Sequence, residues 1–281
     1  MIKRILLVLV GLFIFLFVVN IAVSLHRGRE AIGIIKINGI INDLSVKEWI
    51  SVIEDARKDK RIKAIIVDIN SPGGGVTSSF KLYLALKKIR EDKPVVALLE
   101  SVATSGGYLT ACGANKIIAY PSTITGSIGV ISENINVARA LEKLGLKPFI
   151  IKSGRYKDTG SPFREQTEED RKCLQIVVND VFDEFINIIS EGRNLSKKCV
   201  LKRADGSIWT GRKAKEMGFV DGIGGIEEAK QLAMKLSGLK KKPSFIYLNK
   251  KINFIKRILE EITYFPSFLG RFFYSSLYIQ A

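Results

Sequence analysis

Short apolar runs and helical spacings alternate along the first half of this 281-residue chain. Residues 31–41 are rich in strand-forming side chains, and residues 62–70 contain an Ala-Ile-Ile-Val core that is typical of a strand buried on both faces. Between this run and the next, at 95–99, the apolar residues from Leu82 to Ile89 follow the i, i+3, i+4, i+7 spacing of a helix. This order predicts a layered α/β fold with a parallel sheet.

The second half of the chain continues the alternation and then changes to helices. We expect a helix from near Ser105, strand-like runs at 116–120 and 128–131, a helix carrying Val137, Leu141 and Leu144, and a strand at 149–152. Residues 167–170 resemble a capping box, which predicts a long helix from there to about residue 189. Its core-facing side chains would be Val178, Phe182, Phe185 and Ile189. Two shorter helices are expected around 211–217 and 226–236.

The N-terminal residues 5–25 are apolar apart from one glycine, one asparagine and one serine. About 20 apolar residues are enough to cross a bilayer, so we predict a membrane anchor. A cleaved signal peptide is the alternative, because Lys3 and Arg4 precede the segment and small residues lie at 22–24, although the apolar regions of such peptides are usually shorter. Basic residues flank both ends, so charge alone leaves the orientation open.

The chain is strongly basic, with a formal net charge of +16. Residues 235–257 hold eight basic residues and no acidic one, which beside an anchor favours anionic lipid over nucleic acid. The tail at 240–281 mixes Lys and Arg with aromatic residues, and we expect either a helix lying on the membrane or an extension that seals an oligomer. Three parts are therefore predicted: an anchor with its linker at 1–29, an α/β domain at 30–239, and the tail.

Candidate chemistry is limited by the scarcity of histidine. The chain has one, His26, so a Ser-His-Asp site cannot lie within the α/β domain and a serine nucleophile would need another base. Ser105 precedes two glycines at an expected helix N-terminus, where free N–H groups favour developing negative charge. A helix cap is its alternative role. Lys157 is the candidate base, and it would have to be neutral, with burial lowering its pKa below the usual value of about 10.4.

Two further turns contain residues suited to such a site. The glycines at 73–75 follow a buried strand and could turn N–H groups toward a carbonyl oxygen, although such turns are more often structural. Ser127, in Thr-Gly-Ser-Ile-Gly at 125–129, is the best candidate to orient the lysine amine. The three cysteines show no metal-ligand spacing and no evident pairing, and no nucleotide-binding loop is present. We therefore expect no cofactor.

Five ordered blocks between residues 31 and 239 resemble the signal peptide peptidase A family. They are Asn-Ser-Pro-Gly-Gly-Gly at 70–75, Ala-Thr-Ser-Gly-Gly-Tyr at 103–108, Thr-Gly-Ser-Ile-Gly-Val at 125–130, Ser-Gly-Arg-Tyr-Lys-Asp at 153–158, and Asp-Gly-Ser-Ile-Trp-Thr-Gly-Arg-Lys-Ala at 205–214 with Gly-Phe-Val-Asp at 218–221. The resemblance implies a Clp-protease/crotonase-like layered fold of repeated ββα units with an N-terminal transmembrane helix. It assigns Ser105 as nucleophile, Lys157 as general base, Ser127 as the hydroxyl that positions the lysine, and Gly74 and Gly106 as oxyanion donors.

The same resemblance implies a serine endopeptidase that degrades hydrophobic remnants of cleaved signal peptides. It further implies a single-pass protein of the cell membrane with an extracytoplasmic catalytic domain, and a homo-octamer whose Ser-Lys dyad is shared between neighbouring subunits. Neither a cofactor nor nucleic acid is an expected partner. The alternatives are a related membrane protease that cuts a stomatin-like partner, a crotonase-like acyl-thioester enzyme, and a non-catalytic membrane scaffold.

Overall fold

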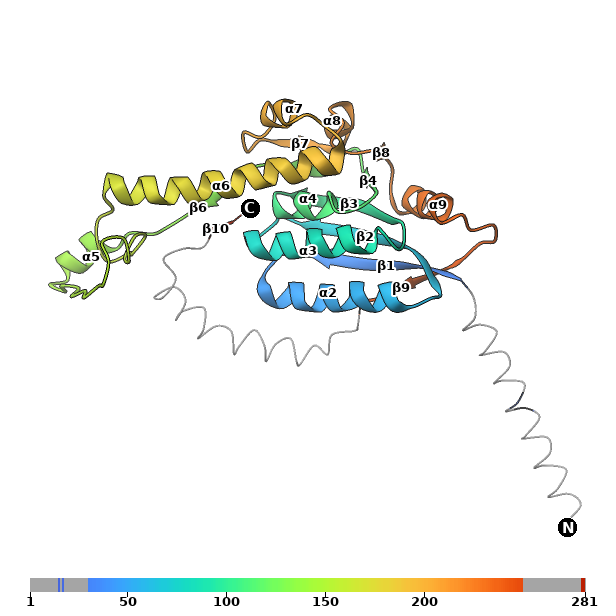
Figure 1. The fold of residues 1–281 in the computed structure, drawn as a ribbon, viewed down its shortest axis with the longest axis horizontal. Helices are drawn as coiled ribbons and strands as arrows, with labels where there is room; N and C mark the ends of the chain where they lie inside the picture. Colours follow the sequence, from blue (N-terminus) through green and yellow to red (C-terminus); the bar gives the residue numbers. More distant parts are fainter. Residues whose placement is uncertain (1–14, 16, 18–29, 250–278, 281) are drawn as a thin grey trace, which may run out of the picture.

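An eight-stranded sheet forms the centre of the computed structural model, which describes residues 15, 17, 30–249, 279 and 280 (Figure 1). The strand order is β7-β5-β3-β2-β1-β9, and β4 pairs with β3 and with β8. All pairs are parallel except β5 with β7. The strands of this sheet are β1 (Ala31–Asn38), β2 (Ile62–Ser71), β3 (Val95–Thr104), β4 (Lys116–Ala119), β5 (Ile124–Gly126), β7 (Ile208–Thr210), β8 (Gly222–Ile223) and β9 (Ser244–Tyr247).

Helices connect most of these strands, and the predicted parallel α/β arrangement is confirmed. They are α2 (Asp43–Lys58), α3 (Val76–Ile89), α4 (Gly106–Ala111), α5 (Ala138–Lys143), α6 (Glu168–Arg193), α7 (Lys197–Leu201), α8 (Gly211–Glu216) and α9 (Ile226–Ser237). The capping box predicted at the start of α6 is present, because Thr167 accepts from the Asp170 N–H and the Asp170 side chain accepts in return. A second, antiparallel pair joins β6 (Ile131–Ser132) to β10 (Ile279–Gln280).

The two faces of the sheet are covered by different helices. Alternate side chains of β2, such as Ile65 and Val67, belong to a cluster with α2, α3, α4 and α6, while Ile66 belongs to a second cluster with Ala229 and Ala233 of α9. These β2 side chains are fully buried, as the run at 62–70 predicts. Full burial of one such aliphatic side chain contributes about 1.5–3 kcal/mol to folding. The clusters therefore hold the strand ends, and the turns that follow them, in fixed positions.

Residues 133–167, here called the arm, extend away from this sheet together with the first part of α6 (Figure 1). The helix expected around Val137 and Leu144 is present as α5, but none of its residues is buried. The strand predicted at 149–152 is wrong: these residues form a loop, with Phe149 88% and Ile151 86% exposed. The described part of the chain places no strand beside them, so their backbone lacks the partner that a strand requires.

Both ends of the chain bear on the sequence predictions. The predicted anchor at 5–25 lies outside the described residues except for Phe15 and Phe17, and no helix within the described part is long and apolar enough to cross a membrane. The tail predicted at 240–281 begins with β9, which pairs with β1 and so continues the central sheet. Residues 250–278 and 281 of the tail lie outside the described residues.

Candidate active site

Ser105 lies between the end of β3 and the start of α4, in a backbone conformation that side chains rarely adopt. Its φ is 51° and its ψ is −121°, and its N–H donates to the Gly126 carbonyl at 2.9 Å. Positive φ in a non-glycine residue stores strain, and such strain gathers at functional sites. The side chain makes no capping hydrogen bond to α4. The helix-cap role considered for this serine is therefore absent, and its half-buried hydroxyl is left for another purpose.

The glycine turn after β2 lies against the start of α4. Ser71 pairs with Ala103 of β3, and the Thr104 hydroxyl donates to the Pro72 carbonyl at 3.0 Å. A Cβ on Gly107 would lie 2.8 Å from the Ser71 carbonyl oxygen, so only glycine allows this approach. The fold thus brings the predicted turn at 71–75 next to Ser105.

Gly74 and Gly106 meet the backbone requirements of the donors expected on this turn and this helix. Gly74 has a φ of +154°, and a Cβ there would lie 2.2 Å from the Ile41 carbonyl oxygen. Gly106 is the first residue of α4, and the first i to i−4 bond of that helix runs from Leu109 to Ser105. Its N–H therefore precedes the intrahelical hydrogen bonds and has no partner inside the helix. Both positions suit a backbone N–H that faces a ligand.

Ser127 is held on the other side of Ser105 by the block at 205–214. Its φ is 50°, and its N–H donates to the Ser207 carbonyl at 2.7 Å. A Cβ on the preceding Gly126 would lie 2.8 Å from the same oxygen. Because Gly126 also accepts from Ser105 and pairs with Thr104, the two serines lie at neighbouring strand ends. Ser207 was not among the predicted site residues, although it lies in the Asp-Gly-Ser block at 205–207 that contributes to the family resemblance.

Lys157 lies on the arm, away from this group. Its side chain is exposed, its N–H donates to the Gly154 carbonyl at 3.2 Å, and among the described residues it makes no hydrogen bond to Ser105 or Ser127. A single copy therefore brings together four of the five predicted site residues. The described part of the chain does not provide the burial expected for the lysine.

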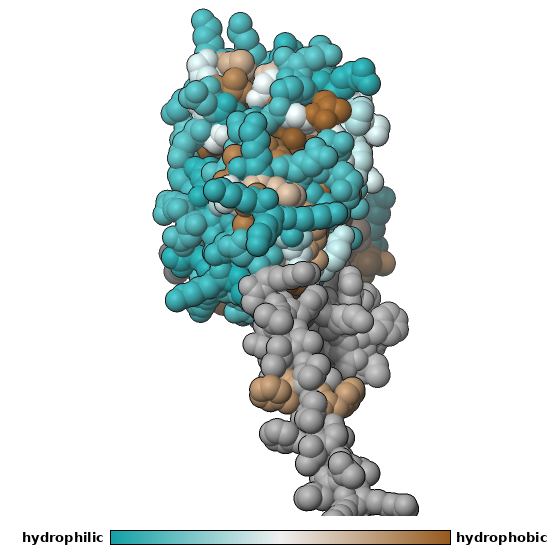
Figure 2. All heavy atoms as spheres, turned by 90° about the vertical axis from the view of Figure 1, so that its right-hand side faces the viewer, coloured by the Kyte–Doolittle hydropathy of each residue, from teal (hydrophilic) through white to brown (hydrophobic). Residues whose placement is uncertain are grey.

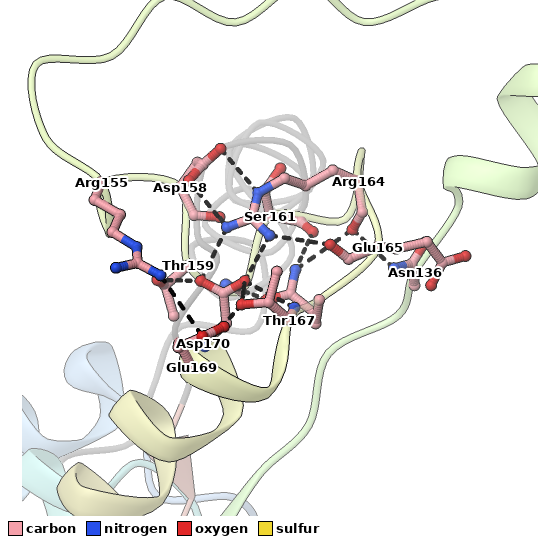
Figure 3. Close-up of polar contacts among 12 residues, drawn as sticks. Asn136, Arg155, Asp158, Thr159, Ser161, Arg164, Glu165, Thr167, Glu169 and Asp170 are labelled. Atoms are coloured by element: carbon pink, nitrogen blue, oxygen red, sulfur yellow. Dashed lines mark hydrogen bonds and ion pairs between the residues drawn. The ribbon is translucent and has the colours of Figure 1, made fainter.

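A partly buried ion cluster lies next to Lys157 in the sequence and ties the loop at 158–170 together (Figure 3). The Arg164 guanidinium donates to Asp158 at 2.9 Å and to both carboxylate oxygens of Asp170, at 2.6 and 3.0 Å. Hydrogen bonds from Arg164 lower the pKa of Asp158 to about 2 and hold the pKa of Asp170 well below its usual range. Asp170 is 3% exposed and also accepts from the Thr159 hydroxyl at 2.8 Å. Sequence analysis found Asp170 only as a helix-capping residue and missed Arg164.

Comparison with known proteins places this geometry in a family. A model of peptidase family S49 matches residues 87–240, and a Clp protease model matches residues 27–125. A provisionally named protease of Synechocystis sp. is 40% identical over 75% of this chain and 76% of its own length. A provisionally named signal peptide peptidase SppA of Enterococcus faecium is 36% identical over 73% of this chain and 64% of its own length.

A plant relative extends the likeness. The protein named serine protease SPPA, chloroplastic, of Arabidopsis thaliana is 31% identical over 83% of this chain, which spans 35% of that relative's length. The matched segments include Gly74, Ser105, Gly106 and Ser127, together with the arm. With a strained serine at the edge of a Clp-protease-like sheet, this chain belongs to peptidase family S49 and is a serine-type protease.

Proposed function

We propose that this protein is a membrane-bound serine endopeptidase that works through a dyad of Ser105 and Lys157 and degrades cleaved signal peptides. The observation that carries the proposal is the conformation of Ser105. Its backbone has a positive φ, its side chain does not cap α4, and it lies next to the glycine turn at 71–75 and directly before Gly106. Membership of family S49 supports peptide hydrolysis over chemistry on an acyl thioester. The relative named signal peptide peptidase supports the substrate class.

The mechanism requires a base that takes the Ser105 proton as its oxygen attacks a peptide carbonyl. Neutral Lys157 accepts this proton and passes it to the leaving amine, so the peptide bond breaks as an acyl-enzyme forms. Water then attacks the ester, with the same lysine accepting its proton and returning one to Ser105. The N–H groups of Gly74 and Gly106 stabilise the oxyanion in both steps, and one donor of this kind lowers a barrier by about 2.7–4 kcal/mol.

The base is supplied by a neighbouring copy in the proposed homo-octamer. The described residues leave apolar side chains on the arm uncovered: Leu144 is 72% exposed, in addition to Phe149 and Ile151. Large exposed apolar surfaces on a soluble domain mark contacts with another molecule. Their position on the segment that leads into Lys157 means that a contact made there also removes water from the lysine, which favours its neutral form.

An apolar cavity beside the donor turns supports hydrophobic substrates. Its volume is about 470 Å³, and it lies between α3, α4 and α6. Val76 immediately follows the glycine turn, and Leu109 lies one turn along the helix that Gly106 begins. Phe80 and Phe185 form further walls. An apolar side chain of a peptide bound at Ser105 fits this lining, and the proposed membrane anchor places the enzyme where signal-peptide remnants collect.

Mixed assemblies test both the dyad and its sharing. Ser105→Ala and Lys157→Ala should each lower cleavage of a signal-peptide substrate at least about 10³-fold. Co-assembly of the two variants at equal amounts should restore about a quarter of wild-type activity, because one subunit contact in four then holds an intact serine and an intact lysine. Lys147→Ala, an exposed lysine on the same arm, is the matched control and should keep full activity.

Two outcomes would contradict the proposal. Normal cleavage by Lys157→Ala would remove the lysine from the mechanism, and mixtures without activity would place both residues in one copy. A stomatin-like tail, offered beside the signal peptide, tests the substrate class. Preferential cleavage of that tail would replace the proposed substrate while leaving the dyad unchanged.

A further inference from the structure

Positively charged side chains gather at the edge of the domain where β1 begins. The Ala31 N–H donates to the Arg61 carbonyl at 2.9 Å, and the Ser244 N–H donates to the Glu30 carbonyl at 3.1 Å. These bonds hold the turn before β2 and the segment before β9 on the two sides of the start of β1, at the right-hand end of Figure 1. We call residues 30, 58–63 and 240–242 the basic rim.

The basic rim holds seven cations and two carboxylates. Both carboxylates already have partners, because Asp59 lies 2.7 Å from the Arg61 guanidinium and Glu30 lies 3.5 Å from Lys63 Nζ. The other five cations are exposed and make no side-chain hydrogen bond or ion pair with the described residues. They are Lys58, Lys60, Lys240, Lys241 and Lys242.

The surroundings of the basic rim do not cancel its charge. Lys93 Nζ donates to the Asp59 carbonyl at 2.7 Å, so the turn before β3 lies beside the rim. That turn adds one exposed acid, Glu91, whose carboxylate has no partner among the described residues. The end of the molecule that carries α9 presents a mainly hydrophilic surface (Figure 2). An excess of free ammonium groups on one edge attracts an anionic partner.

The place of the basic rim along the chain supplies the second observation. Residues 26–29 separate Glu30 from the apolar run at 5–25. The five steps from Leu25 to Glu30 span at most about 18 Å. A bilayer that the apolar run enters therefore lies within reach of the rim. Lysines that come within a Debye length of about 8–10 Å of anionic lipid are attracted to its surface.

We propose that the basic rim binds the anionic headgroups of a lipid bilayer and so fixes the orientation of the domain on the membrane. Two observations point to lipid as the partner: five free ammonium groups supply the complementary charge, and they surround the point where the apolar run joins the fold. The inference rests on the membrane attachment proposed above. It adds which face of the domain meets the lipid.

This orientation sets the candidate active site away from the membrane. The strands β1, β2 and β3 are parallel, so all three begin at the rim end, and Ser105 follows the far end of β3. The ten residues of β3 at about 3.3 Å each give a distance of roughly 30 Å. A signal-peptide remnant must therefore leave the bilayer over that distance before Ser105 can cut it.

Chemical labelling of lysines tests the basic rim on the full chain, held in nanodiscs of phosphatidylcholine alone or with about 30% phosphatidylglycerol. Acetylation by an N-hydroxysuccinimide ester, followed by mass spectrometry, reports how accessible each ammonium group is. The five free rim lysines should be labelled at least about threefold more slowly in the anionic nanodiscs, and about 0.5 M NaCl should remove the difference. The exposed Lys197, Lys198 and Lys202 at α7 are the internal control and should be labelled at the same rate in both nanodiscs.

A triple variant removes the charge of the segment before β9 while leaving the turn before β2 intact. Changing residues 240–242 from Lys to Gln should at least halve the protection of Lys58 and Lys60 in the anionic nanodiscs, because fewer cations then hold the rim to the lipid. The matched triple variant changes Lys197, Lys198 and Lys202 to Gln, and it should leave that protection unchanged. Labelling that is independent of lipid charge, or equal protection at the rim and at α7, would overturn the proposal. Stronger protection by poly(U) RNA than by anionic nanodiscs would replace lipid with nucleic acid.

Co-purification with the zwitterionic nanodiscs reports the membrane attachment by itself. A chain that stays with these nanodiscs but shows no charge-dependent protection would overturn the role of the rim and leave the proposed function standing. A chain that leaves them, yet shows salt-reversible protection in anionic nanodiscs, would contradict the anchor and support the rim.

Discussion

The central sheet and the arm differ in how much of their apolar surface a single chain covers. In β2, the side chains from Ala64 to Val67 are fully buried between two layers of helices. On the arm, α5 has no buried residue and Phe149 is 88% exposed. The sheet therefore positions the serine and its donor turns without help. The arm presents the proposed base on a surface that no other part of the described chain covers.

The two regions also use charge differently. The arm is held by Arg164, which binds two carboxylates directly and keeps their pKa values low. In the sheet, Asp68 of β2 is 6% exposed, and one of its oxygens has no hydrogen-bond partner in the described chain. Burial, with a smaller effect of Glu100, raises the pKa of Asp68 to about 6. The loop of the arm is thus held by the ion pairs of Arg164. In the sheet, the surrounding apolar packing keeps Asp68 buried although one of its oxygens has no hydrogen-bond partner in the described chain.

Gly74→Ala should have the largest effect on activity, because it changes the glycine turn that the central sheet positions beside Ser105. The new Cβ would lie 2.2 Å from the Ile41 carbonyl oxygen, so the turn must shift and the Gly74 N–H with it. We expect kcat for a signal-peptide substrate to fall at least about 100-fold. Gly154→Ala on the arm is the control, since the Cβ that it adds would have no other atom within 4 Å. Equal activity of the two variants would remove Gly74 from the oxyanion site.

Arg164→Leu should have the next largest effect, and it should be confined to the arm. It leaves the buried Asp170 carboxylate without the cation that donates to both of its oxygens, which should cost about 1–3 kcal/mol because solvent at the 24% exposed Arg164 side chain screens the pair. Hydrogen exchange should quicken over residues 152–170 and stay slow in β2. Arg155→Leu, whose exposed pair with Glu169 spans 3.6 Å, should change exchange little. Faster exchange throughout the sheet would show that the arm and the sheet unfold together.

Asp68→Asn should have the smallest effect and should appear only as pH dependence. Because the folded-state pKa of Asp68 is raised, its contribution to stability is fully present below the unfolded value near 3.8 and is lost as pH rises through about 6. The asparagine variant should remove about 2 kcal/mol of this loss. Urea unfolding at pH 4 and pH 7, followed by fluorescence of the buried Trp49, measures it.

The arm should respond to pH with the opposite sign. Asp158 has a lowered pKa, so its contribution to stability is present above pH 3.8 and is lost as pH falls through about 2.

Asp55→Asn on α2 is the matched control for the Asp68→Asn measurement, because its carboxylate is exposed. A wild-type stability that does not fall between pH 4 and pH 7 relative to Asp68→Asn would contradict the assignment.

The sequence predicted those parts of the fold whose pattern is local. The buried run of β2, the helical spacing of α3 and the capping box of α6 each depend on residues within one element, and all three are confirmed. The strand expected at 149–152 failed because an apolar run does not show whether a partner strand exists. The pairing of β9 with β1 was missed for a similar reason, since it joins residues more than 200 positions apart.

The candidate site likewise contains residues whose proximity could be predicted from the sequence and residues whose environment could not. Ser105, Ser127 and the glycine turns follow strands whose order is set by the sheet, so their proximity could be expected. The burial expected of Lys157 could not, because no residue of the described chain covers its side chain. The Arg164 cluster could not be predicted because charged residues on a loop are usually solvated, and nothing local distinguishes an arginine that will bind two carboxylates. The roles of all these residues in catalysis stay predictions.

The pairing of β9 with β1 covers a sheet edge that could otherwise pair with another chain during folding. Ala31 to Ile34 pair with residues 244–247, and the Ser244 N–H donates to the Glu30 carbonyl at 3.1 Å. Without that late segment, β1 would present unpaired backbone groups beside isoleucines, a template for joining another chain edge to edge. A nascent chain that has not yet reached residue 244 therefore leaves this side of β1 unpaired.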